Sequence, residues 1–369
     1  GQAPVSITQH PAPDPQADYS STFHADRVCF DAAWPGLRAH TTVWVSPEDD
    51  VEFRQIDLQN SGDDDLTLEL ISAFEVSLAD PRADEAHPVF SNLFVSAQWR
   101  AASQALVFER RPRQSTELAL CMAHFLVGGD EAVQSLQVQT DRALWRGRNQ
   151  GASQVRAQLQ SVPGGPGVAE APGAPTTEQA AAEPVLLDTG LDPMCALAVR
   201  IRVKAQGQVR LTFATAATPH AATLTAVIDK YRQASHVKRA SLMSATLMGI
   251  RLRSMHLSAQ NFAALQSLTT ALVMSLTRHG AGPAALVPVP PPAAAHAHAP
   301  AHEPAPATAP VCDRRLLWRL GISGDRPLLL VSVATVQGLS LLRTLAHALR
   351  LWAWGGIACD LVVVNAEEA

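Results

Sequence analysis

Residues 46–76 read SPEDDVEFRQIDLQNSGDDDLTLELISAFEV, two strand-like segments joined by a polar turn. From Leu66 to Val76 apolar and polar side chains largely alternate, as is typical of a strand that buries one face and exposes the other. The turn from Asn60 to Asp65 contains residue types that tolerate turn geometry and bond their own backbone. The stretch therefore predicts a hairpin with one buried face, which needs a second apolar layer to cover it.

The first strand of this hairpin shows a break in its alternation. Val51 and Phe53 occupy odd positions, whereas Ile56 and Leu58 occupy even ones. A β-bulge inserts one extra residue and so restores the phase of a strand. We therefore expect a bulge near Gln55 that brings both pairs to the same face.

Working outward, alternating or continuously apolar segments predict further strands at 39–45, 93–99, 105–109, 118–127 and 136–138. The clearest hairpin joins residues 195–203 to residues 209–213 through Gln206-Gly207. Turn signals recur about every ten residues, which is typical of an all-β sandwich.

After residue 220 the period changes to that of a helix. Leu224, Val227, Ile228 and Tyr231 share one helical face, and a second stripe runs over 262–276. Ser258 is a plausible N-cap for the second helix. Residues 328–333, 341–352 and 359–364 read as strand, helix and strand, which predicts a small right-handed βαβ unit.

The predicted fold class is therefore mainly β, an antiparallel β-sandwich followed by a helical pair and a small C-terminal α/β (βαβ) unit. Two Pro/Ala-rich tracts have too little apolar content to pack, and we expect them to be flexible. The expected organisation is a disordered segment at 1–17, the sandwich at 18–220 with a flexible insert at 161–184, linker helices at 221–280, a Pro/Ala-rich linker at 281–311 and a partial βαβ unit at 312–369.

Composition excludes several classes of protein. The net charge of −5 argues against a nucleic-acid partner, which usually needs a basic face. No apolar run is long enough to span a bilayer, and the first eighteen residues lack the apolar core of a signal peptide. Five widely spaced cysteines, without a Cys-x-x-Cys pair, indicate neither a disulfide framework nor a zinc site and favour a reducing compartment.

Several motifs, in the same order, resemble the internal β-sandwich (supersandwich) region of bacterial cyclic β-1,2-glucan synthases. These proteins form the glycosyltransferase family 36 group, also classed as glycoside hydrolase family 94. The motifs are Ser46-Pro-Glu-Asp-Asp50, Ala86-His-Pro-Val-Phe-Ser-Asn-Leu-Phe94, Gln139-Thr-Asp-Arg142, Asp229-Lys-Tyr-Arg232 and Gly321-Ile-Ser-Gly-Asp-Arg-Pro327.

The resemblance implies a parent protein that makes and trims β-1,2-glucan at the inner membrane, on the cytoplasmic side. It also implies that the catalytic acid lies in a downstream helical barrel that this chain lacks. We therefore expect a non-catalytic region that binds or positions carbohydrate, or alternatively a purely structural interdomain scaffold. The expected partners are a β-glucan or oligosaccharide and other domains of the synthase, with no cofactor.

The resemblance further implies that earlier strands of the sandwich are missing before residue 18. An unpaired strand offers free N–H and C=O groups and tends to recruit another strand. We therefore expect an open edge near Ala39–Val45, and with it self-association or dependence on a partner.

The candidate sugar-binding residues lie on a long loop and on two nearby aromatic side chains. Acidic, amide and imidazole groups could bond sugar hydroxyls, and a flat ring could face the sugar. The candidates are Trp34, Asp84, Glu85, His87, Asn92 and Trp99. The alternative is that His87-Pro88 fixes the loop, whose polar side chains then bond its own backbone.

Other polar clusters point to no chemistry. Glu48, Asp49 and Asp50, like the acids of 63–65, precede or fill turns, where carboxylates are usually only solvated. His296, His298 and His302 lie in an Ala/Pro tract with no spacing to fix a metal geometry, so no metal site is predicted. We expect no catalytic residues in this chain.

Overall fold

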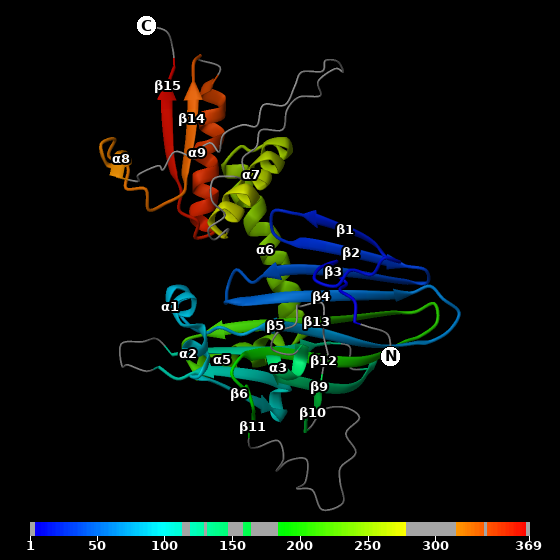
Figure 1. Cartoon of the computed structure of the whole chain (residues 1–369). Helices are drawn as coiled ribbons and strands as arrows, with labels where there is room; N and C mark the ends of the chain where they lie inside the picture. Colours follow the sequence, from blue (N-terminus) through cyan, green and yellow to red (C-terminus); the bar gives the residue numbers. More distant parts are fainter. Residues whose placement is uncertain are drawn as a thin grey trace, which may run out of the picture. The chain divides into compact units, whose positions relative to one another are not determined.

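The computed structural model of the chain describes residues 4–112, 119–128, 131–146, 158–163, 184–277, 315–335 and 338–366. The chain divides into two compact units, Gly1–Ile250 and Arg251–Ala369. Their secondary-structure elements are labelled in Figure 1. The division falls inside the segment for which linker helices are expected.

The first unit contains two antiparallel sheets. The larger has nine strands in the order β1-β2-β3-β4-β13-β8-β7-β6-β11, and the smaller has four in the order β10-β9-β12-β5. Strands of the larger sheet are β1 (Asp18–Phe23), β2 (Val28–Trp34), β3 (Leu37–Val45), β4 (Val51–Asn60), β6 (Val95–Arg100), β7 (Ala105–Arg110), β8 (Leu120–Val127), β11 (Val185–Leu187) and β13 (Gln208–Thr218). Strands of the smaller sheet are β5 (Leu66–Glu75), β9 (Val133–Asp141), β10 (Gln160–Ser161) and β12 (Pro193–Val203).

Two apolar clusters hold this unit together, one on each face of the large sheet. The main core lies between the sheets and includes Ile56, Leu58, Phe108, Leu197 and Phe213. The second lies on the outer face, where strands β4, β7, β8 and β13 meet helices α5 (Ala221–Tyr231) and α6 (Ala234–Ser254). Burial on both faces explains why strands such as β8 are continuously apolar.

The expected bulge near Gln55 is wrong, and the second core explains why. Strand β4 pairs with β3 and with β13 in unbroken register along its length. Val51 and Phe53 belong to the outer cluster, whereas Ile56 and Leu58 belong to the main core. The change of phase therefore marks the point at which β4 switches the face that it buries.

Both expected hairpins are wrong in pairing, although their strands are present. Strand β4 pairs with β13 and strand β5 with β12, so each connection passes from one sheet to the other. The two connections lie side by side, because Asn60 N–H donates to Gly207 O at 2.9 Å and Gln206 N–H donates to Gly62 O at 3.2 Å. They are adjacent corners of the sandwich.

The side chain of Asn60, 1% exposed, ties these corners together. Its Nδ2 lies 2.8 Å from the carbonyl of Asp64, 3.1 Å from that of Lys204 and 3.4 Å from that of Val203, and its Oδ1 accepts from Gly62 N–H at 2.9 Å. The polar residues of the expected turn thus shape a corner between layers.

The N-terminal region differs from expectation in two ways. Strand β3 is paired on both sides, with β2 and β4, so the expected open edge at Ala39–Val45 is wrong; β1 and β2 occupy that side of the sheet. Residues 1–17 are expected to be disordered, but the described part, 4–17, forms turns, and Ile7 packs against the main core.

Of the expected flexible insert at 161–184, residues 164–183 lie outside the described part of the chain. Its beginning is part of the fold, since Ser161 lies in β10 and Val162 is buried in the main core. The expected linker at 281–311 lies wholly outside the described residues.

The helical periods are confirmed. Leu224, Ile228 and Tyr231 form the buried face of α5, with Val227 packed beside them. Helix α7 (Ala259–Thr277) follows Ser258, whose Oγ accepts from Asn261 N–H at 3.2 Å, as an N-cap does. The apolar pattern does not predict helix α6. This helix buries few residues and so has only a weak apolar stripe.

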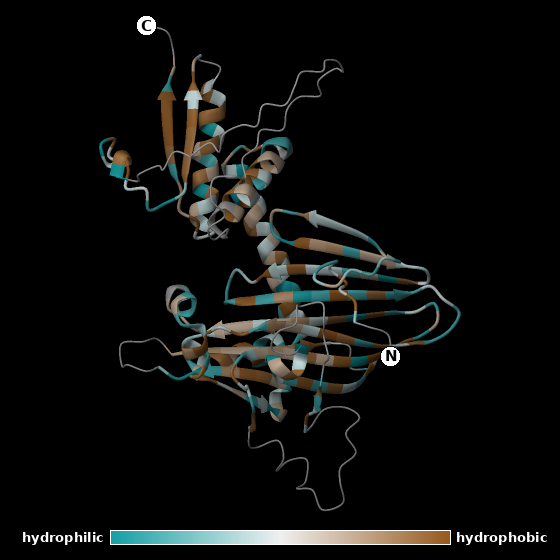
Figure 2. Ribbon diagram, in the orientation of Figure 1, coloured by the Kyte–Doolittle hydropathy of each residue, from teal (hydrophilic) through white to brown (hydrophobic). Residues whose placement is uncertain are grey.

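The second unit contains α8 (Arg315–Trp318) and the expected βαβ unit. Strands β14 (Leu328–Val333) and β15 (Asp360–Asn365) pair in parallel and are connected by α9 (Leu339–Trp354). Their almost uninterrupted hydrophobic character stands out in Figure 2. Helices α7 and α9 share a core around Leu265, Leu272, Ala348 and Trp352. Among the described residues, no helix combines the length and apolar character needed to cross a bilayer.

Candidate functional site

The turn between β3 and β4 consists of Ser46 to Asp50 and is closed by its own first residue. Ser46 N–H donates to Val51 O at 2.9 Å. Ser46 Oγ accepts hydrogen bonds from the backbone N–H groups of Glu48 (3.2 Å) and Asp49 (3.4 Å). This arrangement of a serine at a turn fixes the direction of the two carboxylates that follow it.

Helix α5 brings Tyr231 to this turn. The ring is fully buried and packs edge-on against Phe53, with ring centroids 5.0 Å apart. The Tyr231 hydroxyl donates to Asp49 Oδ2 at 2.7 Å and lies 2.9 Å from Ser46 Oγ. Because the Tyr231 O–H group donates its hydrogen bond to the Asp49 carboxylate, the phenolic oxygen accepts a hydrogen bond from the Ser46 hydroxyl.

Two basic side chains pair with two of the three acids of the turn, Glu48 and Asp49. Lys230 Nζ lies 2.7 Å from Asp49 Oδ2 and 3.1 Å from Glu48 Oε2, and an Arg239 guanidinium nitrogen lies 3.4 Å from Glu48 Oε1. The hydrogen bond to Asp49 is the main reason that the pKa of Lys230 is raised. Desolvation acts to raise the pKa of Asp49, but the hydrogen bonds from Lys230 and Tyr231 outweigh it and hold that pKa below its usual value.

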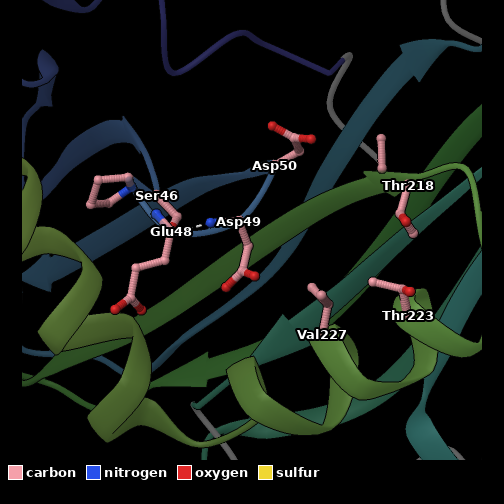
Figure 3. Close-up of a pocket in the computed structure, with 9 residues that line it drawn as sticks. Ser46, Glu48, Asp49, Asp50, Thr218, Thr223 and Val227 are labelled. Atoms are coloured by element: carbon pink, nitrogen blue, oxygen red, sulfur yellow. Dashed lines mark hydrogen bonds between the residues drawn. The ribbon is translucent and has the colours of Figure 1, made fainter.

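An open pocket of about 260 Å³ lies beside this network. Its polar lining comes from Ser46, Glu48 and Asp49 of the network, from Asp50, and from Thr218, at the end of β13, and Thr223, in the first turn of α5. Pro47, Ala217 and Val227 add apolar surface. Figure 3 shows the Asp50 carboxylate pointing away from those of Glu48 and Asp49. The pocket therefore offers one carboxylate outside the ion pairs and two hydroxyls.

Comparison with known proteins places this fold. Residues 1–234 match the family described as glycosyl hydrolase 94, supersandwich domain. The chain belongs to this family. The supersandwich domain thus includes both sheets, helix α5 and the network around Asp49.

A curated relative covers almost the whole chain. It is "Cyclic beta-(1,2)-glucan synthase NdvB" of Rhizobium meliloti (strain 1021), 25% identical over 365 residues, which is 98% of this chain and 11% of the relative. The chain thus spans about a tenth of the length of this relative. Among solved structures, "Heparinase III-BT4657 gene product, Methylated Lysines" matches 56% of the chain and 22% of its own, with a TM-score of 0.26 and 7% identity.

Four of the six predicted sugar-binding residues lie together in the supersandwich domain. The expected long loop consists of two short helices, α1 (Pro81–Ala86), which carries Asp84 and Glu85, and α2 (Pro88–Asn92), which ends at Asn92. His87 joins the two helices and makes no side-chain cap for α2.

An apolar pocket of about 350 Å³ lies at this junction, and among its lining residues His87 has the one polar side chain. The lining residues are Ala86, His87, Pro88, Val89, Phe90 and Leu93.

The two predicted tryptophans lie elsewhere. Trp99 is fully buried in the main core and donates from Nε1 to Pro163 O at 2.9 Å, so it offers no face to a ligand. Trp34 pairs with Leu37 and so lies beside the corner at Asn60. Helix α1 follows the opposite end of β5, roughly 30 Å along the strand. The six residues therefore do not form one site.

The network around Asp49 is the arrangement that sequence reasoning missed. Turn carboxylates are usually solvated, but here two of them are bound by a helix that follows about 180 residues later. The signal was the pair of motifs Ser46-Pro-Glu-Asp-Asp50 and Asp229-Lys-Tyr-Arg232, which supply complementary charges. In the described part of the chain, no cluster of three or more His, Cys, Asp or Glu side chains could hold a metal ion. His296, His298 and His302 lie outside it.

Proposed function

We propose that this supersandwich domain is a non-catalytic region of a cyclic β-1,2-glucan synthase-type protein that binds and positions the glucan. The observation that carries the proposal is the open pocket beside the Asp49 network, lined by Asp50, Thr218 and Thr223. A carboxylate and hydroxyls are suited to bond sugar hydroxyls, and Pro47 and Val227 offer apolar surface to the ring. The likeness to a glucan synthase supports the choice of ligand.

The same geometry supports binding without catalysis. Glycoside chemistry uses two carboxyl groups that flank the scissile bond, one of them protonated to act as the acid. Glu48 and Asp49 are each paired with a cation, and the pKa of Asp49 is lowered rather than raised. The pocket is therefore left with Asp50 as its one carboxylate outside an ion pair among the described lining residues.

Calorimetric titration with linear β-1,2-glucooligosaccharides tests the proposal. We expect saturable heat with the wild-type chain and at least fivefold weaker affinity in Asp50→Asn and Thr223→Val. Asp229→Asn serves as a matched control, since Asp229 is an exposed acid on α5 that does not line the pocket. The same preparations should release no glucose phosphate from β-1,2-glucan and phosphate. An absence of binding, or phosphorolysis by clean protein, would contradict the proposal.

The second candidate function is that of a structural scaffold, in contact with other domains of a longer synthase at the inner membrane. The observation that favours it lies on α2 and the residue after it, where Val89, Phe90 and Leu93 are 56%, 44% and 58% exposed around the apolar pocket. Contiguous exposed apolar side chains are typical of a protein interface. Under this alternative Phe90→Ser would weaken association with the rest of the synthase and leave glucan titrations blank.

A further inference from the structure

Four aromatic side chains lie on one face of the first two strands: Tyr19, Phe23, Phe30 and Trp34, here called the aromatic strip. Their common face follows from the register. Phe30 pairs with Thr41, which pairs with Ile56 of the main core, and directly paired residues point to the same face. Trp34 lies four residues after Phe30 on β2 and therefore points to the same face. Tyr19 and Phe23 pair with Ala32 and Val28, which are both an even number of residues from Phe30 and point to that face as well.

This face is the inner face of the large sheet, but the small sheet does not extend over it. The small sheet lies across β4 and the strands beyond it, whereas β1 and β2 project past its edge (Figure 1). Phe23 is 66% exposed, and the rings of Tyr19, Phe30 and Trp34 are half-buried. The strip therefore presents Phe23 and part of the other three rings on a hydrogen-bonded support, while the N-terminal segment lies against its Trp34 end through Asp14.

One carboxylate and one ion pair accompany the rings. At one end Trp34 Nε1 donates to Asp14 Oδ2 at 2.9 Å, and Asp14 N–H donates to the Tyr19 hydroxyl at 2.9 Å, while the two rings meet edge-on at 6.2 Å. In the cross-strand row of Phe23, Arg54 is paired with Glu52 at 2.6 Å. The Arg54 charge is therefore compensated, whereas Asp14 is held by hydrogen bonds from Trp34 and Gln16 and keeps its negative charge.

Two hydroxyls flank the middle ring. Phe30 lies between Ser21, which is exposed on β1, and Thr41 on β3. Thr41 is 2% exposed, and its Oγ1 has no hydrogen-bond partner among the described residues. The Ser21 hydroxyl therefore lies beside the Phe30 ring on the accessible side, whereas the Thr41 hydroxyl is covered.

We infer that the aromatic strip binds a neutral sugar chain that runs along β1 and β2. Rings with an apolar face match the C–H faces of sugars, and the Ser21 hydroxyl and the Asp14 carboxylate match their O–H groups. The Asp14 carboxylate keeps its negative charge and accepts hydrogen bonds, so the surface complements a hydroxyl-rich uncharged ligand better than an acidic peptide. The inference rests on the proposed function and adds a binding surface to it, separate from the pocket at Asp50.

The dimensions of the strip predict how affinity depends on ligand length. Tyr19 and Phe23 are four residues apart on β1, roughly 13 Å. Rings at both ends can therefore contact different units of one chain. Affinity should rise with the number of glucose units until the chain spans the strip and then stay constant.

The test is titration of Phe23→Ser and Phe30→Ser with linear β-1,2-glucooligosaccharides of increasing length. We expect at least tenfold weaker affinity for long oligosaccharides and a smaller effect for short ones. Leu186→Ser is the matched control, because Leu186 is a 78% exposed apolar residue on β11 at the opposite edge of the same sheet. Phe23→Tyr and Phe30→Tyr should restore binding, and circular dichroism should show that each variant is folded.

A second measurement does not depend on truncated side chains. Trp34 is half-buried within the strip, so ligand should change the tryptophan fluorescence of the wild type, and Trp34→Phe should abolish that change while titration heat remains. The inference would be overturned if folded Phe23→Ser and Phe30→Ser bound long oligosaccharides with the affinity of the wild type. It would also be overturned if Leu186→Ser lost as much affinity as they did. Altered self-association with unaltered sugar affinity would overturn it too. If only Asp50→Asn lost binding, the strip would be excluded and the proposed function would stand; if the wild type bound no oligosaccharide, both would fail.

Discussion

The hydroxyl of Tyr231 donates a 2.7 Å hydrogen bond to Oδ2 of Asp49, a residue 182 positions earlier in the chain. Lys230 Nζ reaches the same oxygen at 2.7 Å. Tyr231 ends helix α5, and Asp49 lies in the turn between β3 and β4. These bonds therefore connect the helix that covers the outer core to the turn at the ends of strands β3 and β4, and they join two of the motifs on which the resemblance to glucan synthases rests.

Replacement of Tyr231 by Phe should destabilise the domain. The variant keeps the ring contact with Phe53 but removes a buried hydroxyl that bonds both Asp49 and Ser46. Loss of one member of a buried polar network costs about 1–3 kcal/mol. Urea unfolding should show this decrease. The control is Asp229→Asn, two residues earlier and exposed on α5, which should change the free energy of unfolding by less than about 0.5 kcal/mol. Equal stabilities of wild type and Tyr231→Phe would contradict the structural role of the hydroxyl.

The contribution of Asp49 should depend on pH in a definite direction. Its pKa is lower in the folded chain than in the unfolded one, so the unfolded state binds more protons as pH falls. The stabilisation is complete above the unfolded pKa of about 4 and is lost as pH falls through the folded pKa. The stability difference between wild type and Asp49→Asn should therefore be large at pH 7 and shrink below pH 4. A difference independent of pH would show that the carboxylate charge is not involved.

The strands of this domain could be predicted because alternation is a local property of the sequence. What could not be predicted was the partner of each strand. The Asn60–Asp65 and Gln206–Gly207 segments have turn chemistry, but the same residues suit a hairpin within a sheet and a corner between sheets. Pairing of β4 with β13 and of β5 with β12 depends on residues more than 100 positions away in the sequence.

Distant parts of the chain also decide which face of a strand is buried and which candidate binding residues are accessible. The phase change at Gln55 suggests a bulge only if one face of β4 is buried, and the helix that buries the other face begins at Ala221. Trp99 reads as an accessible aromatic because its cover, which includes Val162, lies in a segment with the composition of a linker. The candidate residues of α1 and α2 are adjacent in sequence, and for that reason their proximity was predictable.

Replacement of Asn60 by Ala should be more costly than any other polar change in the corner region. Its amide bonds the carbonyls of Asp64, Val203 and Lys204 and accepts from Gly62, and no water can replace it at 1% exposure without rearrangement. Because several buried backbone groups lose their partner together, we expect a loss of at least about 2 kcal/mol. Gln59→Ala, one residue earlier and exposed, is the control for the change in strand propensity. Thermal unfolding that is equal for the two variants would exclude the role of Asn60 at the corner.

His124 on β8 should make the domain sensitive to mild acid. The ring is fully buried, stacked on Phe213 with centroids 5.6 Å apart and edge-on to Phe74 at 5.2 Å. Nδ1 lies 2.9 Å from Thr215 Oγ1, and Nε2 has no hydrogen-bond partner among the described residues. Burial, with a smaller effect of the Arg54 charge, lowers the pKa of His124 to about 3.

Between the unfolded pKa of about 6.5 and this folded value, the unfolded state holds a proton that the folded state excludes. Below about pH 6.5 this residue alone should thus lower the free energy of unfolding by about 1.4 kcal/mol for each unit by which the pH falls. Between pH 7 and pH 5 the decrease is about 2 kcal/mol. His124→Phe keeps both ring contacts and cannot be protonated, so its stability should lack this slope. His220→Gln, an exposed position that makes no side-chain cap for α5, should keep it. Urea unfolding at pH 7, 6 and 5 gives the three slopes. Parallel lines for wild type and His124→Phe would show that the buried imidazole accepts a proton without loss of the fold.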